Sequence, residues 1–109
     1  MRRLAPHEHP RIPRADVEAA RVLEVPVLSA GISGMTLGRL ILVRRGHAGD
    51  GPLLEHELVH VGQWRALGVV GFLRAYLADY LRGRRAGLGH WDAYRAIALE
   101  TEARDFAGR

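Results

Sequence analysis

One five-residue segment constrains this chain more than any other, and its sequence is His56-Glu57-Leu58-Val59-His60. On a helix, residues four apart lie about 5–6 Å from each other on one face, so the two imidazoles can reach one metal ion. The pattern H-E-x-x-H on a helix is typical of a zinc site whose glutamate acts as a general base. The segment therefore predicts a helix with His56 and His60 as zinc ligands and Glu57 as the base.

The neighbouring sequence supports a helix at this position. Asp50 or Gly51 precedes Pro52, which favours a helix start because proline is well suited to the first helical turn. A leucine- and valine-rich run upstream predicts a strand over residues 36–45. A substrate in extended form could pair with the edge of that strand. The residues that would share the metal-facing side of the helix are Leu53, His56, His60, Gln63, Trp64 and Leu67.

The last segment offers a third ligand. Residues 92–107 carry apolar side chains at helical spacing, which predicts one helix. Glu100 lies within that apolar stripe, and Glu102 lies at its edge. A buried carboxylate needs a charged partner, and zinc is a suitable one. We expect Glu100 to be the third ligand, with Glu102 as the alternative; a salt bridge between Glu100 and an arginine is the purely structural explanation.

The two segments together resemble a known family. His56 to Trp64, followed about forty residues later by Glu100 to Ala107, is similar to the minimal gluzincin-type zincins, which are compact metallopeptidase domains. The resemblance covers residues 36–107. It implies that His56, His60 and Glu100 bind zinc and that Glu57 is the general base. In this family an Asp or Asn often follows the ligand glutamate by four residues and orients a histidine.

This chain departs from the family pattern at Arg104, which stands where that Asp or Asn is expected. Asp105 or Glu102 could take over the orienting role.

A peptidase also needs a donor that stabilises the oxyanion of the tetrahedral intermediate. Among His90, Tyr94, Tyr76 and Tyr80, we place His90 first, because it stands at the start of the last predicted helix.

Length and composition predict one small domain. The 109 residues, 48% of them hydrophobic, suffice for a single core. We expect an α+β fold with a short sheet packed on the metal helix, formed by residues 14–109. Three prolines in residues 1–13 predict a mobile N-terminal arm. Since there is no cysteine, the strong metal ligands must be histidines and carboxylates, as in a catalytic zinc site.

The remaining segments give weaker predictions. We expect a short helix over residues 15–23 and an extended run over 24–28, which Pro26 would restrict to an edge strand. Gly68 and Gly71 should break or bend the chain after the metal helix. Residues 72–81 then predict an amphipathic helix whose apolar stripe joins the core. A membrane-surface role for that helix, together with the arginines of residues 82–85, is the alternative.

The net charge and the apolar segments bear on nucleic-acid binding and on location in the cell. The net charge is +4, but every basic residue is arginine and they are scattered, so we expect no nucleic-acid binding. No apolar run is long enough to span a membrane, and no secretory signal is evident, which predicts a cytoplasmic protein.

The predicted activity is hydrolysis of a peptide bond in a peptide or protein substrate, with Zn²⁺ as cofactor. The alternative is a metal-stabilised binding or regulatory module with weak or no hydrolysis. A small domain leaves little chain for the walls of a cleft, so a protein partner could complete it.

Overall fold

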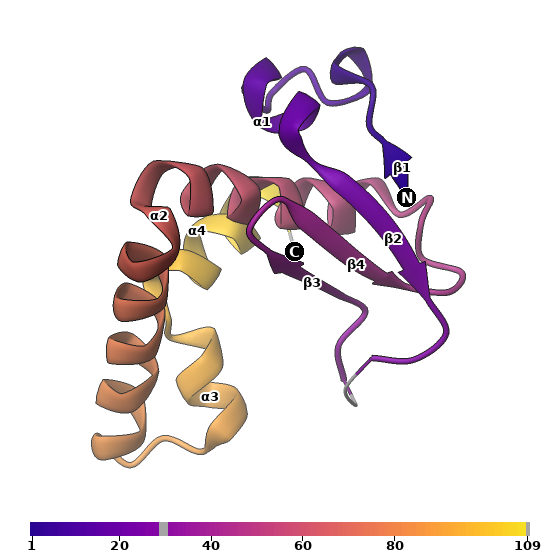
Figure 1. Cartoon of the computed structure of the whole chain (residues 1–109). Helices are drawn as coiled ribbons and strands as arrows, with labels where there is room; N and C mark the ends of the chain where they lie inside the picture. The colour runs from indigo at the N-terminus through magenta and orange to yellow at the C-terminus, as the bar shows by residue number, and fades with distance from the viewer. Residues whose placement is uncertain (29–30, 109) are drawn as a thin grey trace.

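The computed structural model describes residues 1–28 and 31–108. Four short strands form one mixed sheet in the order β1-β2-β4-β3, and the helices pack beside it (Figure 1). The strands are β1 (Arg2–Arg3), β2 (Arg21–Val25), β3 (Gly34–Leu37) and β4 (Leu40–Arg44). β2 and β4 run parallel, and the other two pairs are antiparallel. The predicted α+β class is confirmed.

A β-hairpin replaces the single strand that we predicted over residues 36–45. β3 and β4 pair antiparallel, with Thr36 opposite Ile41 and Leu37 opposite Leu40. Gly38 and Arg39 form the two-residue turn, and Gly38 has φ of 64°, which only glycine adopts at little cost. The prediction was wrong because it took an apolar run through a glycine as one strand. As a result, β3 forms the edge of the sheet that contacts the helix beginning at Gly51.

The strand predicted at 24–28 also lies elsewhere. β2 spans Arg21–Val25 and ends before Pro26, and it pairs on both sides, so it is not an edge strand. The helix expected over 15–23 is shorter: α1 covers Arg14–Ala19, and Ala20 is already extended. Val22 is buried against the helices, which favours a strand here over further helix.

The N-terminal residues, expected to form a mobile arm, pack on the rest of the domain. β1 pairs with β2, and a short 3-10 helix, η1 (Pro6–Glu8), follows. Leu4 and Ile12 are buried in the same hydrophobic core as Val17 and Leu58. Leu4 and Ile12 therefore belong to the same core as the residues that follow Pro13.

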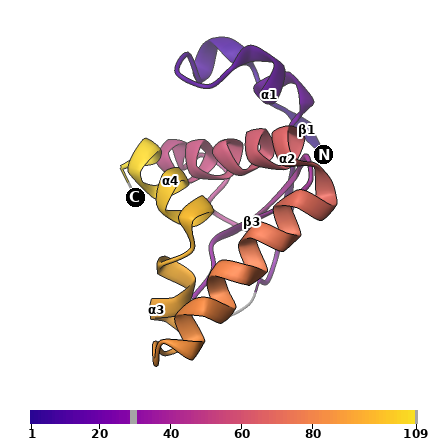
Figure 2. The same cartoon turned by 90° about the vertical axis from the view of Figure 1, so that its left-hand side faces the viewer.

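A long bent helix organises the functional part of the molecule. α2 spans Gly51–Arg85 and begins as predicted, with the Asp50 side chain accepting a hydrogen bond from the Leu53 amide. Gly68 has φ of 74° and ψ of 169°, a conformation essentially restricted to glycine. The helix bends sharply there, so its two halves, residues 51–67 and 69–85, point in different directions (Figures 1 and 2). The predicted break is confirmed at Gly68, whereas Gly71 is helical.

Two short helices fill the angle between the halves of α2. α3 (His90–Arg95) packs on the second half and α4 (Ala98–Ala107) on the first (Figure 2). We predicted one helix over 92–107, but Ile97 is extended and separates the two. The Asp79 carboxylate accepts a hydrogen bond from the Ala98 amide and so holds the start of α4. After this break α4 contacts both halves of α2, at Gln63 in the first half and at Tyr76 and Asp79 in the second.

The apolar stripe expected to pack along residues 72–81 divides into two. Phe72 is buried and Tyr76 and Tyr80 are partly buried, whereas Leu73, Leu77 and Leu81 are exposed.

None of the helices in residues 1–28 and 31–108 is long and apolar enough to cross a membrane.

Candidate metal centre

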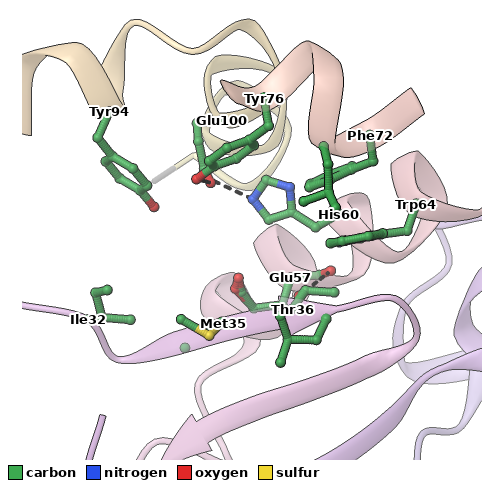
Figure 3. A pocket seen from close by; sticks show the side chains of 13 residues that line it. Ile32, Met35, Thr36, Glu57, His60, Trp64, Phe72, Tyr76, Tyr94 and Glu100 are labelled. Atoms are coloured by element: carbon green, nitrogen blue, oxygen red, sulfur yellow. Dashed lines mark hydrogen bonds and ion pairs between the residues drawn. The ribbon is translucent and has the colours of Figure 1, made fainter. Parts of the chain in front are cut away.

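Three side chains from α2 and α4 converge on one point. Nε2 of His56 lies 3.1 Å from Oε1 of Glu100, and Nε2 of His60 lies 3.0 Å from the same oxygen. Figure 3 shows the His60 ring pointing at the Glu100 carboxylate across the pocket. His60 and Glu100 are each 4% exposed. The local helical spacing places the histidines on one face, and the packing of α4 on residues 51–67 supplies the carboxylate.

The spacing of these atoms fits a tetrahedral zinc ion. Two ligand atoms, each about 2.0–2.2 Å from such an ion, are about 3.3–3.6 Å apart. The two measured separations from Glu100 Oε1 are a few tenths of an ångström shorter. Among the described residues, the group whose ligand atoms all lie within 4.8 Å of one another is His56, Glu57 and His60; Glu100 is not part of it, and its support is its contact with both histidines. Two histidines and one carboxylate are a ligand set that zinc uses in catalytic sites.

The charges of the ligands depend on one another. Burial by itself would raise the pKa of Glu100, but hydrogen bonds with His56 and His60 outweigh it and hold that pKa well below its usual range. Burial would likewise lower the pKa of His60, and the hydrogen bond with Glu100 reverses the effect, so this pKa is raised. Glu100 thus stays ionised, as a metal ligand must be.

A chain of hydrogen bonds fixes the orientation of the His60 ring. Nδ1 of His60 lies 2.8 Å from Oε1 of Gln63. The Gln63 amide nitrogen donates to the Leu99 carbonyl at 3.0 Å and to the Glu102 carboxylate at 3.2 Å. Because both acceptors hold the nitrogen side of the amide, its oxygen faces Nδ1, which then carries the proton. Nε2 of His60 in turn donates to the ionised Glu100 carboxylate, and a zinc ion bound here would displace that Nε2 proton.

Gln63 therefore orients the His60 ring, a role that we did not predict from the sequence. Its signal was its position three residues after His60 on the same helix face. Glu102, the alternative ligand, is exposed and contacts the histidine only through Gln63. Asp105 is exposed, and Arg104 donates to the Arg95 carbonyl at 2.6 Å and to Thr101 Oγ1 at 3.4 Å.

Glu57 lies beside the converging atoms, on the floor of the pocket. It is 3% exposed, and its Oε2 atom has no hydrogen-bond partner among the described residues. Burial raises the pKa of this carboxyl, and the nearby histidines only partly offset the effect. The Thr36 hydroxyl donates to the Glu57 carbonyl at 3.2 Å and so holds β3 against α2. An unpaired buried carboxylate next to ligand groups can accept a proton from water.

Two tyrosines complete the pocket. The Tyr76 hydroxyl donates to Oε2 of Glu100 at 2.6 Å. Tyr94 points its hydroxyl into the pocket between Glu100 and Glu57 (Figure 3). Burial raises the pKa of both phenols above 10, and the charge of Glu100 adds to the rise. Both hydroxyls therefore remain protonated and can donate hydrogen bonds.

His90, our first choice as the oxyanion donor, lies elsewhere. Its ring is exposed at the start of α3, and its Nδ1 lies 2.9 Å from the Tyr80 hydroxyl. Neither His90 nor Tyr80 is among the described residues that line the cavities around Glu57. The structure does not bring His90 into the cleft: it shares a helix face with Tyr94 but lies one turn earlier on α3, beside Tyr80.

Two cavities meet at Glu57 and form one cleft. The first, of about 230 Å³, contains His60, Tyr76 and Glu100. The second, of about 370 Å³, contains His56. Each is several times the roughly 30 Å³ that one water molecule occupies in the liquid, so each has room for a substrate side chain. Glu57 and Tyr94 line both cavities, so their side chains lie where the two cavities meet.

Comparison of the chain with protein-family models, with curated proteins and with solved structures finds no match. The likeness to gluzincin-type zincins therefore rests on the motif residues and stays a prediction.

Proposed function

We propose that this protein is a zinc-dependent peptidase with His56, His60 and Glu100 as ligands and Glu57 as general base. One observation carries the proposal: both histidine Nε2 atoms lie within hydrogen-bond distance of the same Glu100 oxygen, beside an unpaired, buried Glu57 oxygen in a cleft. A structural zinc site has its ligands satisfied and needs no additional carboxylate there. A hydrolytic site needs both the opening and the base.

A bound zinc ion would polarise the scissile carbonyl and make water a stronger nucleophile at neutral pH. Glu57 accepts the proton of the attacking water at its free oxygen and returns it to the leaving amine. The raised pKa of Glu57 suits both steps, because the protonated carboxyl is then less costly to form.

The tyrosines have separate tasks in this proposal. Tyr94 donates a hydrogen bond to the oxyanion of the tetrahedral intermediate, since its hydroxyl faces the centre of the cleft. Tyr76 is already engaged with Glu100, so it holds the ligand carboxylate in place.

The substrate binds in extended form along β3. In the described part of the sheet, β3 pairs only with β4, and Gly34, Met35 and Thr36 line the cavity that contains Glu57. Backbone hydrogen bonds to this edge would provide affinity with little dependence on side chains.

Turnover by the zinc-loaded protein tests the proposal. A peptide library is incubated with the wild type and with Glu57→Gln, and new termini are identified by mass spectrometry. We expect cleavage by the wild type and none by Glu57→Gln, although both bind zinc. Glu55→Gln is the matched control, because Glu55 is on the same helix but pairs with Arg11 outside the cleft. Equal cleavage by Glu57→Gln would falsify the proposal.

Zinc content tests the ligands. The wild type should hold about one equivalent by elemental analysis, and His56→Ala and Glu100→Ala should lose it. Glu102→Gln should retain zinc, because an amide oxygen can still accept the hydrogen bond of Gln63. The reverse result for Glu100→Ala and Glu102→Gln would show that the third ligand is Glu102. Zinc binding without any cleavage would favour the binding-module alternative.

A further inference from the structure

The two ends of the cleft differ in chemistry. On one side of Glu57 the lining is apolar, with Met35, Leu37, Trp64, Phe72 and Leu73. On the other side two arginines, Arg95 and Arg104, line the wall together with Trp91 and Ser33. The converging ligand atoms lie between these ends, since His60 borders the first cavity and His56 the second.

The two arginines carry charges that no carboxylate compensates in the described part of the chain. Arg104 donates only to neutral groups, the Arg95 carbonyl and the Thr101 hydroxyl. Arg95 is exposed, and neither residue belongs to an ion pair among residues 1–28 and 31–108. By contrast, Arg11 and Arg65 pair with Glu55 and Asp16.

The position of Arg104 is set by the same helix that carries Glu100. The two residues are four apart on α4, so they lie on one face about one turn from each other. The hydrogen bond to the Arg95 carbonyl then joins α4 to the end of α3. Arg104 is therefore held beside the ligands and is not a freely moving surface side chain.

We propose that Arg95 and Arg104 bind a carboxylate of the substrate, so that the preferred peptide has an acidic group on one side of the scissile bond and an apolar side chain on the other. The inference rests on the proposed peptidase function. A planar guanidinium suits a carboxylate because its N–H groups form two parallel hydrogen bonds. In this cavity two guanidinium groups stand against one carboxylate, Glu57, so the balance of charge favours an anionic ligand.

Paired peptides test the inference with the zinc-loaded protein. In each pair a leucine is separated by one to three residues from either aspartate or asparagine, in both orders. We expect kcat/KM to be about tenfold or more higher for the aspartate peptide in one of the orders, in keeping with one charge-assisted contact. The preference should weaken as salt is added.

Variants then assign the preference to residues. Arg95→Gln and Arg104→Gln should raise KM for aspartate peptides with little change in kcat, since the lost contact forms equally in the ground and transition states. Arg104→Lys should restore part of the effect. Arg74→Gln is the control, because it removes the same charge from an exposed position that lines neither cavity.

Failure of this inference is distinguishable from failure of the peptidase proposal. Binding of the same peptides to zinc-loaded Glu57→Gln is followed by tryptophan fluorescence, which requires no turnover. Trp91 and Trp64 line the two ends and report on both. Equal or undetectable binding of the aspartate and asparagine peptides overturns the inference, whatever the result for cleavage. If Arg104→Gln loses zinc, the test of the inference is Arg95→Gln. No hydrogen bond of the Arg95 side chain joins two of the described helices or strands, so this substitution should leave the zinc site intact.

Discussion

The amide oxygen of Gln63 lies 2.8 Å from Nδ1 of His60, one turn away on the same helix. This contact joins the His60 ring to α4, since Gln63 also donates to the Leu99 carbonyl and to Glu102. The orientation of the His60 ring therefore depends on the docking of α4, which also carries Glu100.

Replacing Gln63 with Leu should weaken zinc binding without removing a ligand. The His60 ring would lose the acceptor that fixes its tautomer, and losses of this kind typically cost about 10–100-fold in metal affinity. Competition with a chromophoric chelator measures the change. Glu102→Gln serves as the control and should stay near the wild-type affinity. An unchanged affinity in Gln63→Leu would show that the packing of the ring alone orients His60.

Two conservative tyrosine variants should separate oxyanion stabilisation from ligand orientation. Tyr94→Phe should lower kcat by about 10²–10³-fold with zinc retained, because it removes a donor needed mainly in the transition state. Tyr76→Phe should instead reduce zinc affinity, because Glu100 loses the 2.6 Å hydrogen bond. Steady-state kinetics and zinc titrations on both variants provide the comparison. If Tyr76→Phe lowers kcat and leaves zinc affinity intact, the two roles are exchanged.

The bend of α2 should depend on Gly68. Alanine disfavours φ of 74° with ψ of 169°, so Gly68→Ala should cost about 1–3 kcal/mol and displace Phe72 and Tyr76 from the pocket. Gly71→Ala is the matched control. Gly71 has helical geometry and its added methyl group meets only Leu67 of the same helix, so this variant should gain up to about 1 kcal/mol. Chemical denaturation measures both.

The direction of the expected pH dependence should differ between the metal-free and zinc-bound proteins. In the metal-free protein the raised pKa of His60 gives stability that is complete below pH 6.5 and lost as pH rises through the folded pKa. The raised pKa of Glu57 acts in the same direction above pH 4.5. The lowered pKa of Glu100 stabilises above pH 4.5 and is lost only in stronger acid.

Thermal unfolding in the presence of a chelator should therefore show a lower Tm at pH 8 than at pH 5.5. Added zinc should reverse the order, because protons compete with the metal for neutral imidazole and the affinity rises with pH. The control is His60→Gln, whose metal-free Tm should depend less on pH. A metal-free Tm that rises from pH 5.5 to 8 would contradict the assignment of a coupled His60–Glu100 pair.

Local patterns were sufficient for part of this structure. The helix start at Asp50, the break at Gly68 and the shared face of His56 and His60 follow from capping, glycine geometry and helical periodicity, which depend on neighbouring residues only. The burial of Glu100 followed from the apolar stripe around it, for the same reason.

The predictions that were wrong concern segments whose conformation depends on contacts with residues distant in the sequence. The run over 36–45 has strand-forming residues throughout, and only pairing across Gly38 makes it a hairpin. Residues 92–107 have helical periodicity, but separate contacts with the two halves of α2 divide them at Ile97. His90 and Tyr94 share one face of α3, and only the position of α3 along the second half of α2 places Tyr94 at the cleft and His90 beyond it, beside Tyr80.

By itself, the sequence determined which side chains share a helix face, because the helical repeat is a local property of the backbone. The tertiary structure decided which faces meet. The docking of α4 on residues 51–67 brings the Glu100 oxygen to the imidazoles of His56 and His60, which lie 44 and 40 residues earlier in the chain. It also places Gln63 against Glu102. Such contacts depend on the burial of apolar surface between whole elements, which no short stretch of sequence specifies.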